Sequence, residues 1–168
     1  LKFFDWAYAK GDDMATALSY VPLPDALVAS IHGYQYPVKK TLPETFFLRG
    51  SDCWGWATWR RAWQCFNPDG QALLANLEAQ RLTSAFDLDG ACGFTQMLKD
   101  QINRKNDSWA IRWHASCYLA NMFTLYPSKS FVDNIGMDGT GEHCSPSNLY
   151  ANTLSNFYFS FHQLNTLK

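Results

Sequence analysis

Three short stretches of this sequence combine aromatic rings, glycines and charged side chains, residue types that can bind and activate hydroxyl-bearing ligands. They cover residues 49–63, 106–113 and 134–144. An indole ring can stack on a flat, amphipathic ligand such as a sugar ring. An ionised carboxylate can take a proton from a hydroxyl group, and glycine-rich backbone can present N–H groups to phosphate. Each stretch also has a purely structural interpretation.

The first stretch places Gly55 between Trp54 and Trp56, with Asp52 just before them. A glycine lets the backbone come close to a ligand while the two rings frame it. Asp52 could hydrogen-bond to sugar hydroxyls, or it could cap the helix predicted to follow. The tryptophans could equally be core packing at a helix start, as most large aromatic residues are. Both interpretations stay open from the sequence.

The second stretch places Asp107 just before Trp109 and Arg112, at the start of a predicted helix. A helix N-terminus stabilises a negative charge, and an ionised carboxylate within reach of a hydroxyl can act as a general base. Aspartate is also a favoured N-cap residue and could serve helix stability alone. Arg112 could neutralise a diphosphate, or it could be a solvated helix residue.

The third stretch is a glycine-rich loop that contains Asp138, Gly139 and His143. Its backbone N–H groups could bind phosphate, and His143 could contact a metal ion or a diphosphate. A glycine-rich turn with an ordinary surface histidine is the alternative.

The runs CWGWATW at residues 53–59 and NIGMDGTGEHC at residues 134–144 resemble segments of bacterial, family-2-like glycosyltransferases with the GT-A fold. The resemblance covers about residues 1–144. It implies transfer of a sugar, with inversion, from a nucleotide-sugar donor to a glycan or other hydroxyl acceptor. It implies that Asp107 is the catalytic base and that His143 is a metal ligand. The substrate contacts that it implies are Asp52, Trp54, Gly55, Trp56, Trp109, Arg112, Asp138 and Gly139.

The resemblance also implies a divalent metal, Mn²⁺ or Mg²⁺, held mainly by an acidic motif that ends a strand. We interpret Asp12 and Asp13 as a solvated turn rather than that motif, because a predicted aromatic helix precedes them where a strand is required. The resemblance places the motif, and with it the nucleotide-binding half, before Leu1. Residues 1–144 would be the C-terminal, acceptor-side part of a GT-A-like domain, and residues 145–168 a tail or arm.

Two alternatives to an enzyme remain. The aromatic residues could belong to a non-catalytic carbohydrate-binding or interaction module. The chain could also be a truncated remnant, in which the face that once met the missing half is apolar and favours a homodimer.

The pattern of apolar and turn residues predicts a helix-rich α/β domain with a few short strands, and the resemblance implies that it is part of a GT-A-like domain. It lacks the run of βα units of a nucleotide-binding half. In the helix predicted over 56–66, the spacing of Trp56, Trp59, Trp63 and Phe66 indicates one apolar face, and we expect Trp59 and Trp63 in the core. Other helices are predicted at 1–10, 71–80, 94–103 and 109–120, and strands at 26–32, 45–48, 123–126 and 130–135.

Composition narrows the partners and the compartment. The net charge of −1, from 14 basic and 15 acidic residues, gives no electrostatic reason to expect nucleic acid. The five cysteines form no CxxC pair, so free thiols in the cytoplasm are expected. No apolar run is long enough to be a transmembrane segment.

Overall fold

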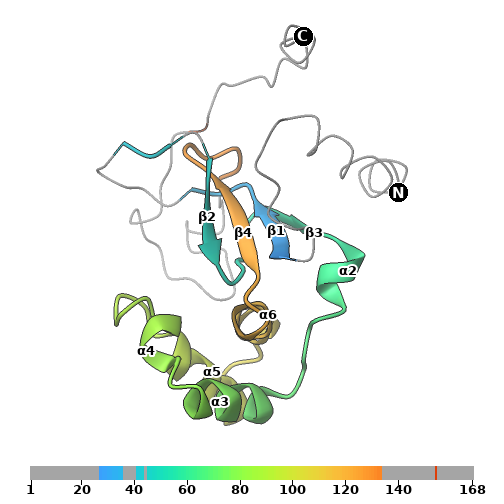
Figure 1. Cartoon of the computed structure of the whole chain (residues 1–168), viewed down its shortest axis with the longest axis vertical. Helices are drawn as coiled ribbons and strands as arrows, with labels where there is room; N and C mark the ends of the chain where they lie inside the picture. Colours follow the sequence, from blue (N-terminus) through green and yellow to red (C-terminus); the bar gives the residue numbers. More distant parts are fainter. Residues whose placement is uncertain (1–26, 36–40, 44, 134–153, 155–168) are drawn as a thin grey trace, which may run out of the picture.

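In this computed structural model, the residues whose structure can be described are 27–35, 41–43, 45–133 and 154. Their strands are β1 (Val28–His32), β2 (Thr45–Arg49), β3 (Trp56–Thr58) and β4 (Phe123–Pro127). Their helices are α2 (Arg60–Trp63), α3 (Gly70–Ala79), α4 (Thr83–Phe86), α5 (Phe94–Ile102) and α6 (Trp109–Leu119). Figure 1 shows the sheet on one side of α6 and the helices α3, α4 and α5 on the other.

Several predictions from the sequence fall outside the described residues. These are the helix at 1–10, the turn at Asp12 and Asp13, the glycine-rich loop at 136–144 and the boundary before the tail at 145–168.

The four strands form one sheet in the order β2-β4-β1-β3. The central strands β1 and β4 are parallel, and the outer strands β2 and β3 pair with them antiparallel. The Thr124 hydroxyl donates a 2.8 Å hydrogen bond to the Gly50 carbonyl and lies 2.7 Å from the Ser30 hydroxyl, which can therefore donate to it. Ser30 and Thr124 are fully buried, so these bonds remove the cost of burying two polar groups.

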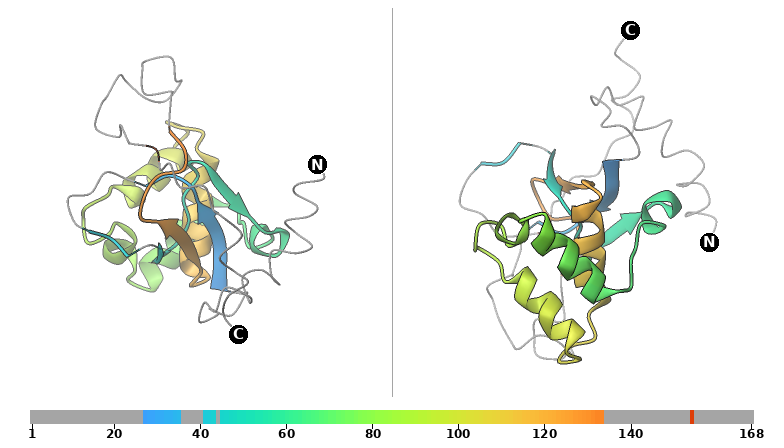
Figure 2. Two further views of the ribbon diagram at one scale, coloured as in Figure 1. Left: turned by 90° about the horizontal axis from the view of Figure 1, so that it is seen from above. Right: turned by 60° about the horizontal axis from the view of Figure 1, so that its bottom comes forward.

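Helix α6 lies between the sheet and the other long helices (Figures 1 and 2). Ile111, Ala115 and Tyr118 pack in a cluster with side chains from α3, α4 and α5. Trp113 and Cys117 pack in a second cluster with side chains from β1 and α2. A helix that is apolar on more than one side is buried inside a domain, which explains why no narrow apolar stripe marks this segment.

The three long helices end in the same way, without glycine. In α3, α5 and α6 the residue after the C-cap has a positive φ, at Arg81 (56°), Arg104 (59°) and Asn121 (55°). In each, its N–H and the following N–H donate back to carbonyls of the last turn. This is the Schellman arrangement, which satisfies carbonyls that a helix end otherwise leaves unpaired.

Arg49 and Gly50 connect the end of β2 to α6. The Arg49 guanidinium lies 4.2 Å from the Tyr118 ring centroid and donates two hydrogen bonds, of 3.0 and 2.9 Å, to the Tyr118 carbonyl near the helix C-terminus. Gly50 has φ +96° and lies against the His114 imidazole. His114 Nδ1 in turn lies 2.7 Å from the Ser51 carbonyl oxygen, to which it can donate.

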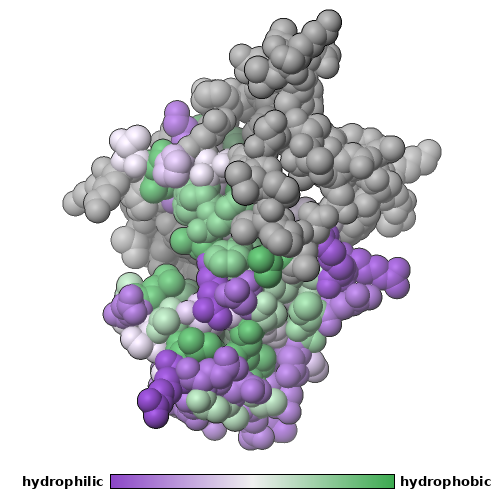
Figure 3. All heavy atoms as spheres, viewed as in Figure 1, coloured by the Kyte–Doolittle hydropathy of each residue, from purple (hydrophilic) through white to green (hydrophobic). Residues whose placement is uncertain are grey.

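The surface follows this division into a sheet side and a helical side. On the face shown in Figure 3, hydrophilic residues cover much of the helical part at the bottom, and apolar residues gather near β2 and β4. None of the described helices has the length and apolar character that crossing a membrane requires.

The structure confirms a mixed α/β fold. The helices predicted at 71–80, 94–103 and 109–120 and the strands predicted at 26–32, 45–48 and 123–126 are also confirmed, to within two residues at each end. Asp69 is the N-cap of the first of these helices and accepts a 3.0 Å hydrogen bond from Ala72 N.

Two predicted elements are wrong. The helix over 56–66 is replaced by strand β3 and the four-residue helix α2, because Trp56 pairs with His32 of β1 across the sheet. Residues 130–133 are not a strand, although Phe131 N donates to the Gly33 carbonyl at 2.8 Å. Both errors arise because the conformation of these residues depends on pairing with residues distant in the sequence, which a local sequence pattern cannot indicate.

We predict that Gly50→Ala destabilises the chain strongly. A β-carbon would lie 2.7 Å from His114 Nδ1 and closer still to Cε1, and the positive φ disfavours any side chain. Gly90→Ala is the matched control, because Gly90 has φ +89° but nothing within 4 Å of the added β-carbon. In urea titrations, each variant should lose about 1–2 kcal/mol from backbone strain, and Gly50→Ala a further 1–3 kcal/mol, roughly, from overpacking. Equal losses would contradict this packing.

Candidate functional site

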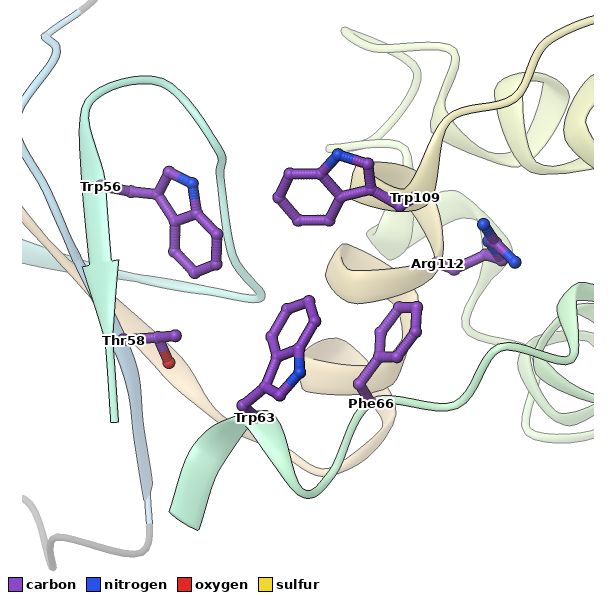
Figure 4. A pocket seen from close by; sticks show the side chains of 6 residues that line it. All are labelled: Trp56, Thr58, Trp63, Phe66, Trp109 and Arg112. Carbon is purple, nitrogen blue, oxygen red and sulfur yellow. The ribbon is translucent and has the colours of Figure 1, made fainter. Parts of the chain in front are cut away.

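A shallow aromatic pocket of about 460 Å³ opens between β3, α2 and the start of α6 (Figure 4). In Figure 4 the rings of four residues point toward a common space, and the Arg112 side chain extends beyond them on the α6 side. The pocket is lined by Trp56, Thr58, Trp63, Phe66, Trp109 and Arg112. Of the predicted site residues, the structure therefore brings Trp56, Trp109 and Arg112 together.

The rings in this aromatic pocket are packed at contact distance and yet partly open to solvent. Trp63 stacks on Phe66 with ring centroids 4.9 Å apart, and Trp56 lies 5.6 Å from Trp109. Trp63 is 40% exposed and Trp109 41% exposed. Exposed aromatic surface in a concave site is the usual setting for stacking on a ligand.

The walls of the aromatic pocket are fixed by the sheet and by α6. Trp56 lies opposite His32, the last residue of β1, so this wall stands at the carboxyl end of that strand. Trp109 is the first residue of α6, whose N-cap Ser108 accepts a 3.3 Å hydrogen bond from Ile111 N. The fully buried Trp113 lies behind, with its ring centroid 5.0 Å from that of Trp63.

Arg112 belongs to two adjacent pockets. One of its terminal nitrogens donates a 3.1 Å hydrogen bond to the Pro68 carbonyl, and its guanidinium carbon lies 5.9 Å from the Phe66 ring centroid. The second pocket, here called the polar pocket, has a volume of about 560 Å³. It is lined by Gln101, Arg104, Lys105, Asn106, Asp107 and Arg112.

Asp107, the predicted base, lies in the polar pocket and is exposed. The interpretation of Asp107 as the helix cap is wrong, because the next residue, Ser108, is the N-cap. Among the described residues, the Asp107 carboxylate has no hydrogen-bond or ion-pair partner. The oxygens of this exposed carboxylate are therefore accessible to a ligand in the polar pocket.

Asp52 and Trp54 do not line the aromatic pocket, and both lie against the His32 side chain. Asp52 Oδ1 accepts a 2.6 Å hydrogen bond from Cys53 N and lies 3.7 Å from His32 Nε2. The Trp54 ring packs edge-on against Tyr34, with 5.1 Å between centroids, and Trp54 N donates to His32 Nε2 at 3.2 Å. These two residues therefore do not line the pocket that contains Trp56.

Gly55 has a structural role within the chain. Its φ is +56°, and a β-carbon there would clash with the Val132 side chain, whose Cγ1 would be 3.0 Å away. Its carbonyl also accepts a 2.7 Å hydrogen bond from Gly33 N. The absence of a side chain thus makes room for Val132. The turn at Gly55 separates Trp54, which packs on Tyr34, from Trp56, which lines the aromatic pocket.

The third predicted stretch, with Asp138, Gly139 and His143, falls outside the described residues. Within the part of the chain that is described, no group of three or more His, Cys, Asp or Glu side chains could hold a metal ion. Burial raises the pKa of the Cys53 thiol to about 11 and that of Cys117 to about 12, so neither is a nucleophile at neutral pH.

Sequence reasoning missed Trp63, Phe66 and Thr58 as pocket residues. Trp63 was expected in the core, and that expectation is wrong, because its ring lines the pocket and is 40% exposed. The spacing of Trp56, Trp63 and Phe66 in the sequence could have predicted this pocket, because these three rings do lie together. They do so across a strand and a short helix rather than along one helix face.

Comparisons with known proteins leave the family open. No family model matches the chain, and no solved structure matches it. A stretch of 31 residues is 55% identical to part of the phosphate-binding protein PstS of Haemophilus influenzae. The match covers 18% of this chain and 9% of that protein, which is too little of either to show a shared fold or function.

Two buried histidines near these sites predict a pH dependence of stability. Burial lowers the pKa of both His32 and His114, although the Asp52 carboxylate opposes the shift in each. A group with a lowered pKa in the folded state stabilises the protein fully above its unfolded pKa of 6.5. This stability is lost as the pH falls below that value, because only the unfolded chain then gains the proton.

We therefore expect the free energy of unfolding to fall between about pH 7.5 and 5.5, by at most about 1.4 kcal/mol per histidine and pH unit. Urea titrations across this range measure how the free energy of unfolding changes with pH. NMR titration of the imidazole C–H signals shows whether His32 and His114 cause that change. Imidazoles of His32 and His114 that both titrate at or above pH 6.5 in the folded chain would contradict the assignment.

Proposed function

We propose that this chain is the acceptor-side part of a nucleotide-sugar-dependent glycosyltransferase with a GT-A-like fold, and that the aromatic pocket binds its saccharide acceptor. The observation that carries the proposal is that Trp56 and Trp109, from two motifs distant in the sequence, line one pocket with Arg112. Ring faces suit the C–H groups of a sugar, and Arg112 offers hydrogen-bond donors to its hydroxyls.

We assign Asp107 as the base because Arg112 lines both the aromatic pocket and the polar pocket that contains Asp107. An acceptor that extends from one pocket into the other would present a hydroxyl group to this carboxylate. Asp107 would take the hydroxyl proton as the oxygen attacks the anomeric carbon of the donor sugar. The bond to the nucleoside diphosphate breaks in the same step, and the diphosphate leaves with the electron pair.

The proposal leaves the predicted Mn²⁺ or Mg²⁺ to residues beyond those described. Among the described residues, no cluster of three or more His, Cys, Asp or Glu side chains could hold a metal ion, and the predicted ligand His143 lies outside these residues. We therefore derive no step through a metal and assign to this part of the chain only acceptor binding and proton transfer.

A non-catalytic carbohydrate-binding module is the second candidate. It is favoured by the composition of the aromatic pocket, in which four rings accompany only Thr58 and Arg112. Such a site can bind a saccharide without any reactive group. The two candidates share the aromatic pocket and differ only in whether Asp107 takes part in a reaction.

Saccharide binding is tested by Trp109→Ala, with Trp59→Ala as the control. Trp109 lines the aromatic pocket, whereas Trp59 lies outside it against the Arg61 guanidinium, 4.7 Å from its ring centroid. We expect Trp109→Ala to weaken binding about tenfold, the loss that removing one stacked ring produces. Trp59→Ala should bind like the unchanged chain. Calorimetric titration with an oligosaccharide library measures both, and equal affinities in the two variants would argue against the pocket.

Catalysis is tested by Asp107→Asn in the full-length product of the gene that encodes this chain. With nucleotide sugars and Mn²⁺, we expect the transfer rate to fall at least about a hundredfold, since a general base contributes about 10²–10⁴. Binding of the donor should be unchanged. Asp89→Asn, at another exposed aspartate, is the control. If the full-length protein binds saccharide but transfers no sugar from any nucleotide sugar, the binding-module candidate is the better account.

A further inference from the structure

The polar pocket beside the aromatic pocket carries an excess of positive charge. Arg104, Lys105 and Arg112 line it, and Asp107 is the one acidic residue among its lining residues. Lys105 Nζ lies 3.5 Å from Asp100 Oδ1, so a second carboxylate compensates part of this charge. Three cations against two carboxylates leave a surplus of one positive charge.

This surplus lies where a ligand in the aromatic pocket would extend. Arg112 lines both pockets, and its side chain in Figure 4 extends beyond the rings. Its hydrogen bond to Pro68 uses one terminal nitrogen and leaves donors on the other. Among the described residues, the exposed Arg104 guanidinium has no hydrogen-bond or ion-pair partner.

The backbone conformation at position 104 does not favour an arginine. Arg104 has φ 59° in the Schellman end of α5, a position that favours glycine or asparagine. A cation at a helix C-terminus also stabilises the helix dipole, by a modest amount at an exposed site. Arg81 holds the same position at the end of α3, with φ 56°, and lies outside the polar pocket. The two arginines therefore separate the effect of the helix end from that of the pocket.

We propose that the saccharide bound by this chain is acidic, with a carboxylate in the polar pocket and a neighbouring ring in the aromatic pocket. The inference rests on the proposed function and specifies the class of its acceptor as a uronic-acid saccharide. Guanidinium groups bind carboxylates through paired, charge-assisted hydrogen bonds. A carboxylate matches the surplus of one positive charge, whereas a phosphate monoester carries about −1.5 to −2 charges near pH 7.

The test is calorimetric titration with oligosaccharides of galacturonate, glucuronate and mannuronate, each beside its methyl ester and a neutral analogue. The ester keeps the ring and removes the charge. We expect at least one acid to bind about tenfold more tightly than its ester at low salt, and the difference to shrink as salt is added. Arg104→Gly should reduce this preference at least about threefold, and Arg81→Gly should leave it unchanged.

The alternative outcomes are distinct. Equal binding of acid, ester and neutral analogue, abolished by Trp109→Ala, overturns the acidic acceptor and keeps the saccharide site. Tighter binding of a sugar 6-phosphate than of any uronic acid overturns the carboxylate. A preference for acids that Arg104→Gly does not reduce, or that Arg81→Gly reduces equally, overturns the assignment to the polar pocket. If neither these oligosaccharides nor any member of the wider oligosaccharide library binds, both the acidic acceptor and the proposed function are overturned.

Discussion

Helix α6 packs against both hydrophobic clusters of the described chain, and the positions of the other elements depend on it. Ile111, Ala115 and Tyr118 fix the helices α3, α4 and α5 against it. Trp113 and Cys117 fix the sheet and α2. Because buried side chains are close-packed, the relative positions of the sheet and the helical layer are set through this one helix.

The aromatic pocket follows from that arrangement. Trp109 and Trp113 are four residues apart in α6 and therefore share one side of the helix, but only Trp113 is fully buried. The rings of Trp56 and Trp63 pack against the buried indole, at 6.1 and 5.0 Å between centroids. The exposed Trp109 ring extends this aromatic surface to the solvent. The same buried residue thus stabilises the core and orients the rings available to a ligand.

The sequence predicts much of this fold where the cause is local. Helix α3 begins after the capping Asp69, α5 follows from its apolar spacing, and α6 follows from the capping residues that precede it. The strand at Trp56–Thr58 was missed because it depends on pairing with β1. Asp107 and Ser108 are adjacent and are both favoured N-cap residue types, so the sequence does not decide between them. The structure places the cap of α6 at Ser108. The separation of Trp54 from Trp56 depends on the backbone conformation of Gly55, which its sequence position does not reveal.

The claim that the aromatic pocket is a saccharide site is tested most directly by NMR of the tryptophan indole N–H signals during titration with the saccharides. We predict that the signals of Trp56, Trp63 and Trp109 shift together along one binding curve, while that of Trp59 stays in place. Shifts at Trp54 without shifts at Trp109 would contradict this prediction, because they would place the ligand beside Tyr34, outside the aromatic pocket. No shift at any pocket indole with any saccharide would contradict the saccharide site itself.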